Sequence, residues 1–510
     1  MKNTFTQSMA WLHTWAGLVF GWLLFAIFVT GTLAVFDKEL DHWMHPEVPT
    51  TQVSQAEAAR RAVDYLQQHQ PGADNWGISL PTERSPGLSV STGERRRGGG
   101  VQLDPQTGEP IEVRDSVGGN FFFRFHFTLN LPRNWGIFVV GALALVMLAG
   151  LVTGIVIHKK IFKEFFTFRP HKGQRSWLDF HNASAVLLLP FHLMITYTGL
   201  VIFMLIYIPA AVDTLFEGNT RAYFQSQTGP RAETPRQLAR QPGQLVEVAP
   251  LLAEAEAHMG PIAGLNIRNP NTAAARIEIR PELGNRIALT KGQSMVFDGV
   301  TGERLGEPPE LRPAPLTQRV MTGLHFAQFG GYAMRWLYFV CGLVSCAMIA
   351  SGLVLFCVKR ARKYADASVP SVAQRWYRVA EVCNVAFVAG LLVACIGLLW
   401  ASRLLPVELA QREAWEVRAF FGLWALSLMH AALRPARRAW VEQLGLAALL
   451  CGGLGLVGAF SELVDRTRIL VEVCSLAMGL LLAVAAWRVA VPAQVPEKRN
   501  VRARPVEIRG

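Results

Sequence analysis

The amino-acid sequence predicts a polytopic α-helical membrane protein of about eight transmembrane helices, built from a duplicated helix–loop–helix unit with two α+β modules outside the membrane. Of its 510 residues, 51% are hydrophobic and only 17% are charged. This balance excludes a disordered chain and disfavours an ordinary soluble enzyme. Apolar stretches long enough to cross a hydrocarbon core of about 30 Å recur along the chain. Histidine-containing motifs recur in two halves, which indicates an internal repeat.

The first apolar stretch is too long for a cleaved signal peptide and lacks a small-residue cleavage site, so it is predicted to be a retained helix. Basic residues gather in short loops that all fall on one side of the membrane if both termini are cytoplasmic. We therefore expect an integral membrane protein with both termini on the inner side. The predicted order is a span at 1–36, a periplasmic module at 37–134, a span at 135–158, a cytoplasmic loop at 159–182, a span at 183–208, a second periplasmic module at 209–332, a span at 333–358, a cytoplasmic loop at 359–378, four further spans in 379–490 and a cytoplasmic tail at 491–510.

The two long polar segments share one scheme. Each begins with a helix-forming stretch, at 54–70 and 246–258, and continues with short β-type runs: GISLP and LSVST in the first segment, ARIEIRP and RIALT in the second. Each also contains a similar hairpin turn, DPQTGE at 104–109 and DGVTGE at 298–303. Each segment is therefore expected to form a small α+β module.

The net charge of +12 does not indicate nucleic acid as a partner, because the basic residues flank the apolar spans. The lipid bilayer is the expected environment. All seven cysteines lie in or at the ends of apolar spans, and the sequence has no Cys-x-x-Cys motif. Neither a disulfide framework nor a cysteine-based metal site is expected.

One apolar span carries two histidines, His181 and His192, at a spacing that returns to nearly the same helix face. Pro190 removes a backbone hydrogen bond and should kink this helix just before His192. An ionisable side chain at membrane depth is by default a functional-site hypothesis. His181 is followed seventeen residues later by Thr-Gly, and so is His13.

A second repeated element also contains histidine. His126 lies in RFHFTLN, before an apolar helix ending TGIVIHKK, and His325 lies in GLHFAQF, before one ending SGLVLFCVKR. Imidazoles facing each other across a helical bundle, with no carboxylate or cysteine beside them, suit b-type haem. Zinc or copper would need three or four closely spaced ligands, and a proton relay normally recruits Asp or Glu. The sequence therefore predicts two b-type haems.

The duplication suggests how the ligands pair. Symmetry-related residues meet near a pseudo-twofold axis, so His13 and His181 are predicted to clamp an inner haem, and His126 and His325 an outer one. His158 and His192 have no repeat partner and are the competing ligands. The shared face of His181 and His192 would let one helix ligate both haems, displacing one member of the outer pair.

Two arginines follow the outer histidines closely. Arg133 and Arg335 are candidates for holding haem propionates, although interfacial snorkelling explains them equally well. No dinucleotide fingerprint occurs in a cytoplasmic loop, so the expected electron donor is a separate cytoplasmic reductase or a membrane quinol. No catalytic residue beyond the haem ligands is identified.

The sequence resembles the PepSY-associated transmembrane family, and is most similar to inner-membrane siderophore reductases of the FoxB type. The resemblance covers roughly residues 1–365 and rests on LHTWAGLVFGWLLFAIFVTGTLAVF, the two His-Phe elements, HKKIFKEFFTFRPHKGQRSWLDFHN and LPFHLMITYTGL. It implies a di-haem protein that reduces ferric iron held by a periplasmic siderophore, and so releases it as Fe(II). The four spans after residue 379 lie outside this resemblance. A non-enzymatic siderophore permease or accessory subunit, and a regulatory membrane protein with PepSY-like loops, are the alternatives.

Overall fold

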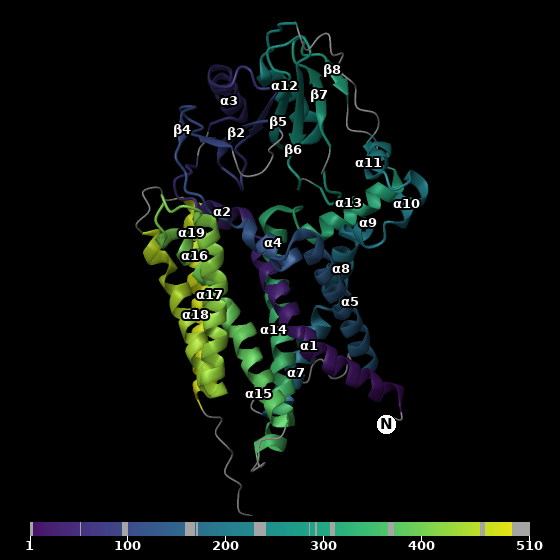
Figure 1. Cartoon of the computed structure of the whole chain (residues 1–510), viewed down its shortest axis with the longest axis vertical. Helices are drawn as coiled ribbons and strands as arrows, with labels where there is room; N and C mark the ends of the chain where they lie inside the picture. Colours follow the sequence, from purple (N-terminus) through teal and green to yellow (C-terminus); the bar gives the residue numbers. More distant parts are fainter. Residues whose placement is uncertain are drawn as a thin grey trace, which may run out of the picture.

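The computed structural model describes residues 4–50, 53–93, 100–158, 169, 172–228, 241–284, 286–290, 293–306, 312–365, 372–459 and 465–491. The molecule is a multi-pass helical membrane protein whose long helices run side by side, with a β-sheet region at one end of the bundle (Figure 1). The first described residues lie near the opposite end (Figure 1). This end-to-end arrangement gives the bundle a sheet side and a far side.

Six helical stretches in the described part of the chain are long and apolar enough to span a membrane, and a bent pair makes a seventh. Helix α17 (Arg412–Leu433) is the remaining one of the eight predicted spans, and it runs beside α16 and α18 (Figure 1). Four charged residues lie in its first two turns, but its 22 residues, about 33 Å at 1.5 Å per residue, are long enough for a crossing. The candidate spans are α1 (Phe5–Ala34), α5 (Arg133–Ile157), α14 (Gly331–Ala365), the run Val372–Leu404, α18 (Ala436–Gly458) and α19 (Arg466–Ala490).

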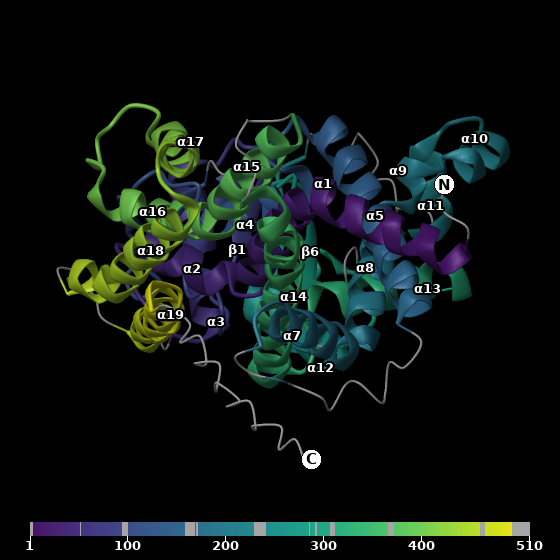
Figure 2. The same cartoon turned by 90° about the horizontal axis from the view of Figure 1, so that it is seen from below.

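The run Val372–Leu404 consists of α15 (Val372–Val385), a π-helical turn η2 (Ala386–Gly390) and α16 (Leu391–Leu404). Asn384, at the end of α15, joins this run to the helices before it. Its side chain accepts a 2.8 Å hydrogen bond from the Trp22 indole and donates one of 2.9 Å to the Leu353 carbonyl. Seen along the bundle, α16–α19 gather on one side of α1 and α14 (Figure 2).

The bent pair confirms the predicted kink and shows a helix that extends into the predicted cytoplasmic loop. Helices α7 (Gln174–Leu187) and α8 (Leu189–Ile202) meet at 64°, with Pro190 in the first turn of α8. The cytoplasmic loop was predicted to extend to residue 182, but α7 begins at Gln174. Its first turns are polar, so hydropathy alone underestimates the helix. Asp179 is held there by the Arg169 backbone and side chain at 3.1 Å and 2.8 Å.

The two external segments share one antiparallel sheet of eight strands in the order β4-β3-β2-β1-β5-β6-β7-β8. Strands β1 and β5 join the halves, with Ile78 opposite Leu265. Helices α3 (Gln55–His69) and α12 (Val248–Met259) bury their apolar faces against this sheet, as predicted for two α+β modules. The strands are β1 (Asn75–Ser79), β2 (Leu88–Thr92), β3 (Val101–Leu103), β4 (Pro110–Ile111), β5 (Ile262–Arg268), β6 (Arg276–Pro281), β7 (Met295–Asp298) and β8 (Arg304–Gly306).

Both predicted hairpins form: the backbone N–H of Asp104 donates to Glu109, and that of Asp298 to Glu303, each at 2.8 Å. The strand predicted at RIALT is wrong. Its Leu289 N–H donates instead to the carbonyl of Arg319 on α13, at 3.2 Å, so this stretch leaves the sheet. The central strand β5 was not predicted at all.

Several short helices lie between the sheet and the spans (Figure 1). Helices α4 (Asn120–Thr128) and α13 (Pro313–Phe326) occupy equivalent places in the two repeats and carry the two His-Phe elements. Each ends in a left-handed residue, Leu129 and Ala327, both with φ of 52°. The others are α2 (Asp37–Met44), α9 (Met204–Tyr207), α10 (Ala210–Phe216) and α11 (Thr220–Thr228).

Candidate functional site: two histidine pairs

Two histidines meet in the half of the bundle away from the sheet. His13 comes from the third turn of α1, and His181 from the middle of α7. Their ring centroids are 6.3 Å apart, and the ring planes are inclined at 68°. The two residues occupy corresponding positions in the two repeats, as the sequence symmetry predicted.

Two more histidines meet on the sheet side. His126 on α4 and His325 on α13 have ring centroids 6.0 Å apart, with the planes inclined at 37°. The structure therefore brings together both histidine pairs that the duplication indicated. Each pair takes one residue from each repeat.

The Nδ1 atom of each of the four rings contacts a neighbouring helix at a Ser-Gly or Thr-Gly dipeptide. The contact is with the hydroxyl of that dipeptide, with a backbone carbonyl one helical turn before the dipeptide, or with both. The dipeptide always belongs to the same repeat as the histidine that it contacts. The Nδ1 contacts are His13 with the Gly150 carbonyl (3.0 Å) and the Thr153 hydroxyl (3.1 Å), His126 with the Ile27 carbonyl (2.8 Å), His181 with the Met348 carbonyl (2.9 Å) and the Ser351 hydroxyl (3.4 Å), and His325 with the Thr198 hydroxyl (3.1 Å).

The glycine of each dipeptide makes room for the ring. An added Cβ at Gly31 would lie 2.5 Å from Nδ1 of His126, which no side chain could tolerate without a shift. At Gly199 and Gly352 the Cβ would approach the rings of His325 and His181 to 3.0 Å, and at Gly154 it would lie 3.5 Å from His13. The dipeptides therefore combine a hydrogen-bonding residue with a close backbone approach.

These contacts fix the tautomer of the rings. A carbonyl can only accept, so the Nδ1 atoms of His13, His126 and His181 carry the proton. The Thr198 hydroxyl donates to the Met194 carbonyl at 2.7 Å, so it accepts from Nδ1 of His325. The lone pair of each ring is then on Nε2, which no hydrogen bond reaches within the described chain. An Nδ1 held by backbone with a bare Nε2 is the usual arrangement of a metal-binding histidine.

Space is available beside the rings. All four histidines are only partly buried, although they lie between helices. Gly17, one turn after His13, and Gly150 face open space, because a Cβ on either would meet nothing within 4 Å. Small residues at these positions leave room for a flat group between the helices.

The competing histidines are placed differently. His192 is fully buried, and its Nε2 lies 2.9 Å from the Ser345 hydroxyl. Ser345 uses its own proton on the Cys341 carbonyl at 2.7 Å, so Nε2 of His192 is the donor. The 64° bend lies between His181 on α7 and His192 on α8, so the two residues are not on one straight helix. His158 caps the far end of α5, one turn beyond Gly154.

The two arginines also differ from each other. Arg133 is exposed in the first turn of α5. Arg335 is only 6% exposed, and its guanidinium reaches the Gln328 carbonyl at 3.4 Å, three residues after His325. Of the two arginines, only Arg335 is therefore both buried and close in the chain to a histidine of the outer pair. Within the described ranges, no group of three or more His, Cys, Asp or Glu side chains could hold a metal ion by itself.

A family comparison agrees with this architecture. Residues 10–359 match the family model described as the PepSY-associated TM region. The chain belongs to the PepSY-associated TM family. The matched region contains both repeats and all four paired histidines, whereas α15–α19 lie beyond it. The resemblance inferred from the motifs is thus confirmed at the level of the family.

One curated relative of this PepSY-associated protein is the uncharacterised protein PA4219 of Pseudomonas aeruginosa. It is 35% identical over 135 residues, which are 25% of this chain and 32% of that protein. The chain thus covers about one third of the relative's length. The relative's printed name assigns no activity.

Sequence reasoning found the histidines but missed what holds them. Thr30-Gly31 and Thr198-Gly199 were recognised only as markers of a repeat, and Thr153 and Ser351 only as parts of helix ends. The sequence did contain a signal for these contacts, namely four Ser-Gly or Thr-Gly dipeptides in the membrane helices, two in each repeat. Their pairing with histidines on other helices became visible only in three dimensions.

Proposed function

We propose that this PepSY-associated protein is a di-haem reductase of the bacterial inner membrane. His13 and His181 would hold one b-type haem, and His126 and His325 would hold a second. The carrying observation is the ring spacing of 6.3 Å and 6.0 Å, together with the bare Nε2 atoms. A metal–imidazole bond is about 2 Å long, so two rings that held one metal ion between them would have centres about 6 Å apart, which fits both pairs.

The residues around the histidines would set the properties of a bound haem. A bound haem supplies reversible one-electron chemistry at iron. The carbonyls and hydroxyls on Nδ1 fix ring orientation and raise the basicity of Nε2. Gly17 and Gly150 leave space beside the inner pair. Arg335, poorly hydrated near the outer pair, suits a propionate carboxylate, whereas the exposed Arg133 suits it less.

The direction of electron flow follows from the positive-inside pattern. The far side of the bundle would face the cytoplasm, and the sheet would lie in the periplasm. Electrons from a cytoplasmic reductase or a membrane quinol would then enter at the His13–His181 pair and leave at the His126–His325 pair. The substrate proposed at the outer side is ferric iron in a siderophore, because reduction to Fe(II) weakens binding by hard oxygen ligands.

The test uses purified full-length protein, reduced with dithionite and freed of excess reductant under argon. A ferric trihydroxamate and a ferric tricatecholate are added separately, while the b-type absorption and trapped Fe(II) are followed. We expect haem reoxidation with one Fe(II) formed per electron lost, and no reaction with the matching gallium complexes. A colourless protein that binds these complexes would instead support a siderophore permease or accessory subunit.

A further inference from the structure

The helices beyond the family region hold α4, the short helix that carries His126. The side chain of Phe420, on α17, lies 4.9 Å from Phe121 and 5.5 Å from Phe125, measured between ring centroids. All three rings are almost completely buried. Edge-on aromatic contacts of this kind add to the burial of apolar area and fix the relative position of two helices.

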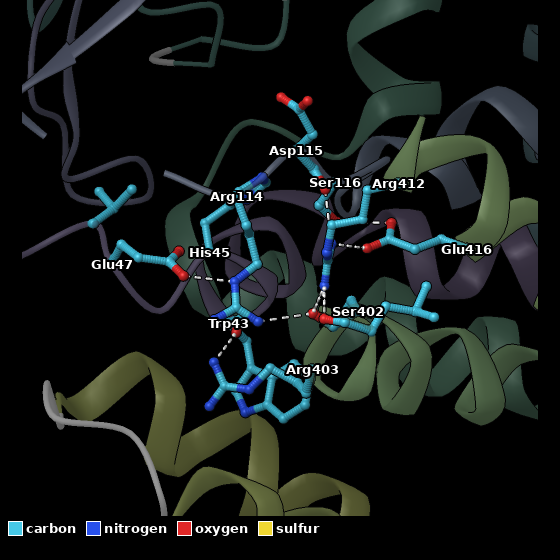
Figure 3. A network of polar contacts seen from close by, with 12 residues as sticks. Trp43, His45, Glu47, Arg114, Asp115, Ser116, Ser402, Arg403, Arg412 and Glu416 are labelled. Carbon is cyan, nitrogen blue, oxygen red and sulfur yellow. Dashed lines mark hydrogen bonds and ion pairs between the residues drawn. The ribbon is translucent and has the colours of Figure 1, made fainter. Parts of the chain in front are cut away.

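A buried ion pair on α17 holds the backbone that leads into α4 (Figure 3). Arg412 and Glu416 are both 0% exposed and bind each other. Arg412 donates to the Asp115 carbonyl at 2.7 Å, and Glu416 accepts from the Ser116 hydroxyl and the Val117 N–H, both at 2.9 Å. Helix α4 begins only three residues after Val117, so the ion pair fixes its starting point.

The helices beyond the family region also hold α4 indirectly, through α2. Gly118 has φ of 62°, and an added Cβ would overlap the Asp41 carboxylate of α2. Helix α2 is itself attached to the start of α19, where Asp465 lies 2.7 Å from Nε2 of His42. The beginning of α4 is therefore enclosed between α17 and an α2 that α19 anchors.

A fully buried ion pair is weak evidence for stability, because desolvation opposes the attraction of the charges. Its hydrogen bonds are directional, however, and allow only one arrangement of the groups they join. The Arg412–Glu416 pair satisfies two backbone groups and one hydroxyl in the 115–117 segment. A pair built in this way restricts position more than it adds stability.

We propose that Arg412 and Glu416 are positioning residues for His126. They fix the start of α4 and thereby the orientation of the His126 ring toward its partner. This inference rests on the proposed function, since it requires His126 to ligate a haem. It assigns to α17, which lies beyond the family region, the task of setting the geometry of the outer pair.

The test compares full-length Glu416→Gln with wild type in a potentiometric titration followed by b-type absorption. We expect two haems per chain in both proteins, but a tenfold or larger change in the reduction equilibrium constant of one haem. Tenfold corresponds to about 59 mV for one electron. The other haem keeps its potential. Hydrogen exchange in residues 116–128 should also be faster in the variant.

Two further variants keep the test decisive. Ser116→Ala removes one hydrogen bond to Glu416 and should change the same haem to a smaller extent, even if Glu416→Gln folds poorly. Glu442→Gln breaks the contacts with Arg434 and His430 at the other end of α17 and should change neither potential. If the Glu416→Gln protein is fully loaded with haem and both potentials are unchanged, or if both haems change equally, the positioning role of Arg412 and Glu416 is refuted. The proposed function is not affected by that result. A wild-type protein without haem refutes the proposed function as well.

Discussion

Gly31→Ala is the sharpest perturbation of the outer histidine pair. The new methyl carbon would lie 2.5 Å from Nδ1 and 2.7 Å from Cε1 of His126. Non-bonded heavy atoms are comfortable at about 3.5 Å or more, so the ring or α1 must move by roughly 1 Å. Metal–ligand distances tolerate only about 0.2 Å. Overpacking of this kind costs about 1–3 kcal/mol, which weakens binding at the outer pair by roughly 5- to 150-fold.

The assay is haem content per chain, measured as the pyridine haemochrome, together with the reduced-minus-oxidised spectrum. We expect Gly31→Ala to retain about one haem, because the His13–His181 pair is untouched. Alanine is a better helix former than glycine by about 1 kcal/mol, so a weakened helix cannot explain the loss.

Gly154→Ala is the matched control for this substitution. It makes the same chemical change in an equivalent dipeptide, but its Cβ would lie 3.5 Å from His13, an ordinary contact. The control should keep both haems. A Gly31→Ala protein with two haems and an unchanged spectrum would refute the reasoning about the close backbone approach.

Three further outcomes follow from the same contacts. His192→Ala should lower the free energy of unfolding by about 1–3 kcal/mol, because a buried hydrogen bond is lost, while haem content stays at two; loss of a haem would make His192 a ligand. Thr198→Val removes the hydroxyl 3.1 Å from Nδ1 of His325 and should weaken haem binding at the outer pair about tenfold, with no effect on the inner spectrum. Burial opposes the charge on Glu39, yet Arg84, at 2.7 Å, lowers its pKa below 4.5. The stability from this pair is therefore complete above pH 4.5 and is lost as pH falls through the lower folded pKa, and melting curves of Arg84→Met should lack that acid-side loss.

The helical part of the fold could be predicted because its signal is local and strong. Long apolar runs fixed most spans, and the missing backbone hydrogen bond at Pro190 located the bend of 64°. The polar first turns of α7 lie in the predicted cytoplasmic loop, where Asp179 stabilises them by a contact that hydropathy does not register. Helix α17 begins at Arg412 and carries the buried Arg412–Glu416 pair in its first turns, a feature that hydropathy does not register.

The single sheet could not be predicted because it depends on long-range pairing. Strand β5 (Ile262–Arg268) contacts β1 across almost two hundred residues, and no local pattern specifies such a partner. RIALT has strand-like composition but gives its Leu289 N–H to α13. The tertiary environment outweighed local propensity at both places.

The histidine pairs were predictable because duplication turns sequence correspondence into spatial symmetry. Residues with the same role in two repeats tend to meet near the axis, and this brought His126 opposite His325. The contacts that hold the rings were not predictable, since a Thr-Gly dipeptide is common in membrane helices for packing reasons alone. Their function depends on which neighbouring helix they face.

Electron paramagnetic resonance of the oxidised full-length protein tests most directly whether the four paired imidazoles hold iron. We expect two low-spin signals of bis-imidazole type per chain. One should be lost in His13→Ala and in His181→Ala, and the other in His126→Ala and in His325→Ala. A protein that carries no haem, or one whose signals disappear in His158→Ala or His192→Ala instead, would contradict the account.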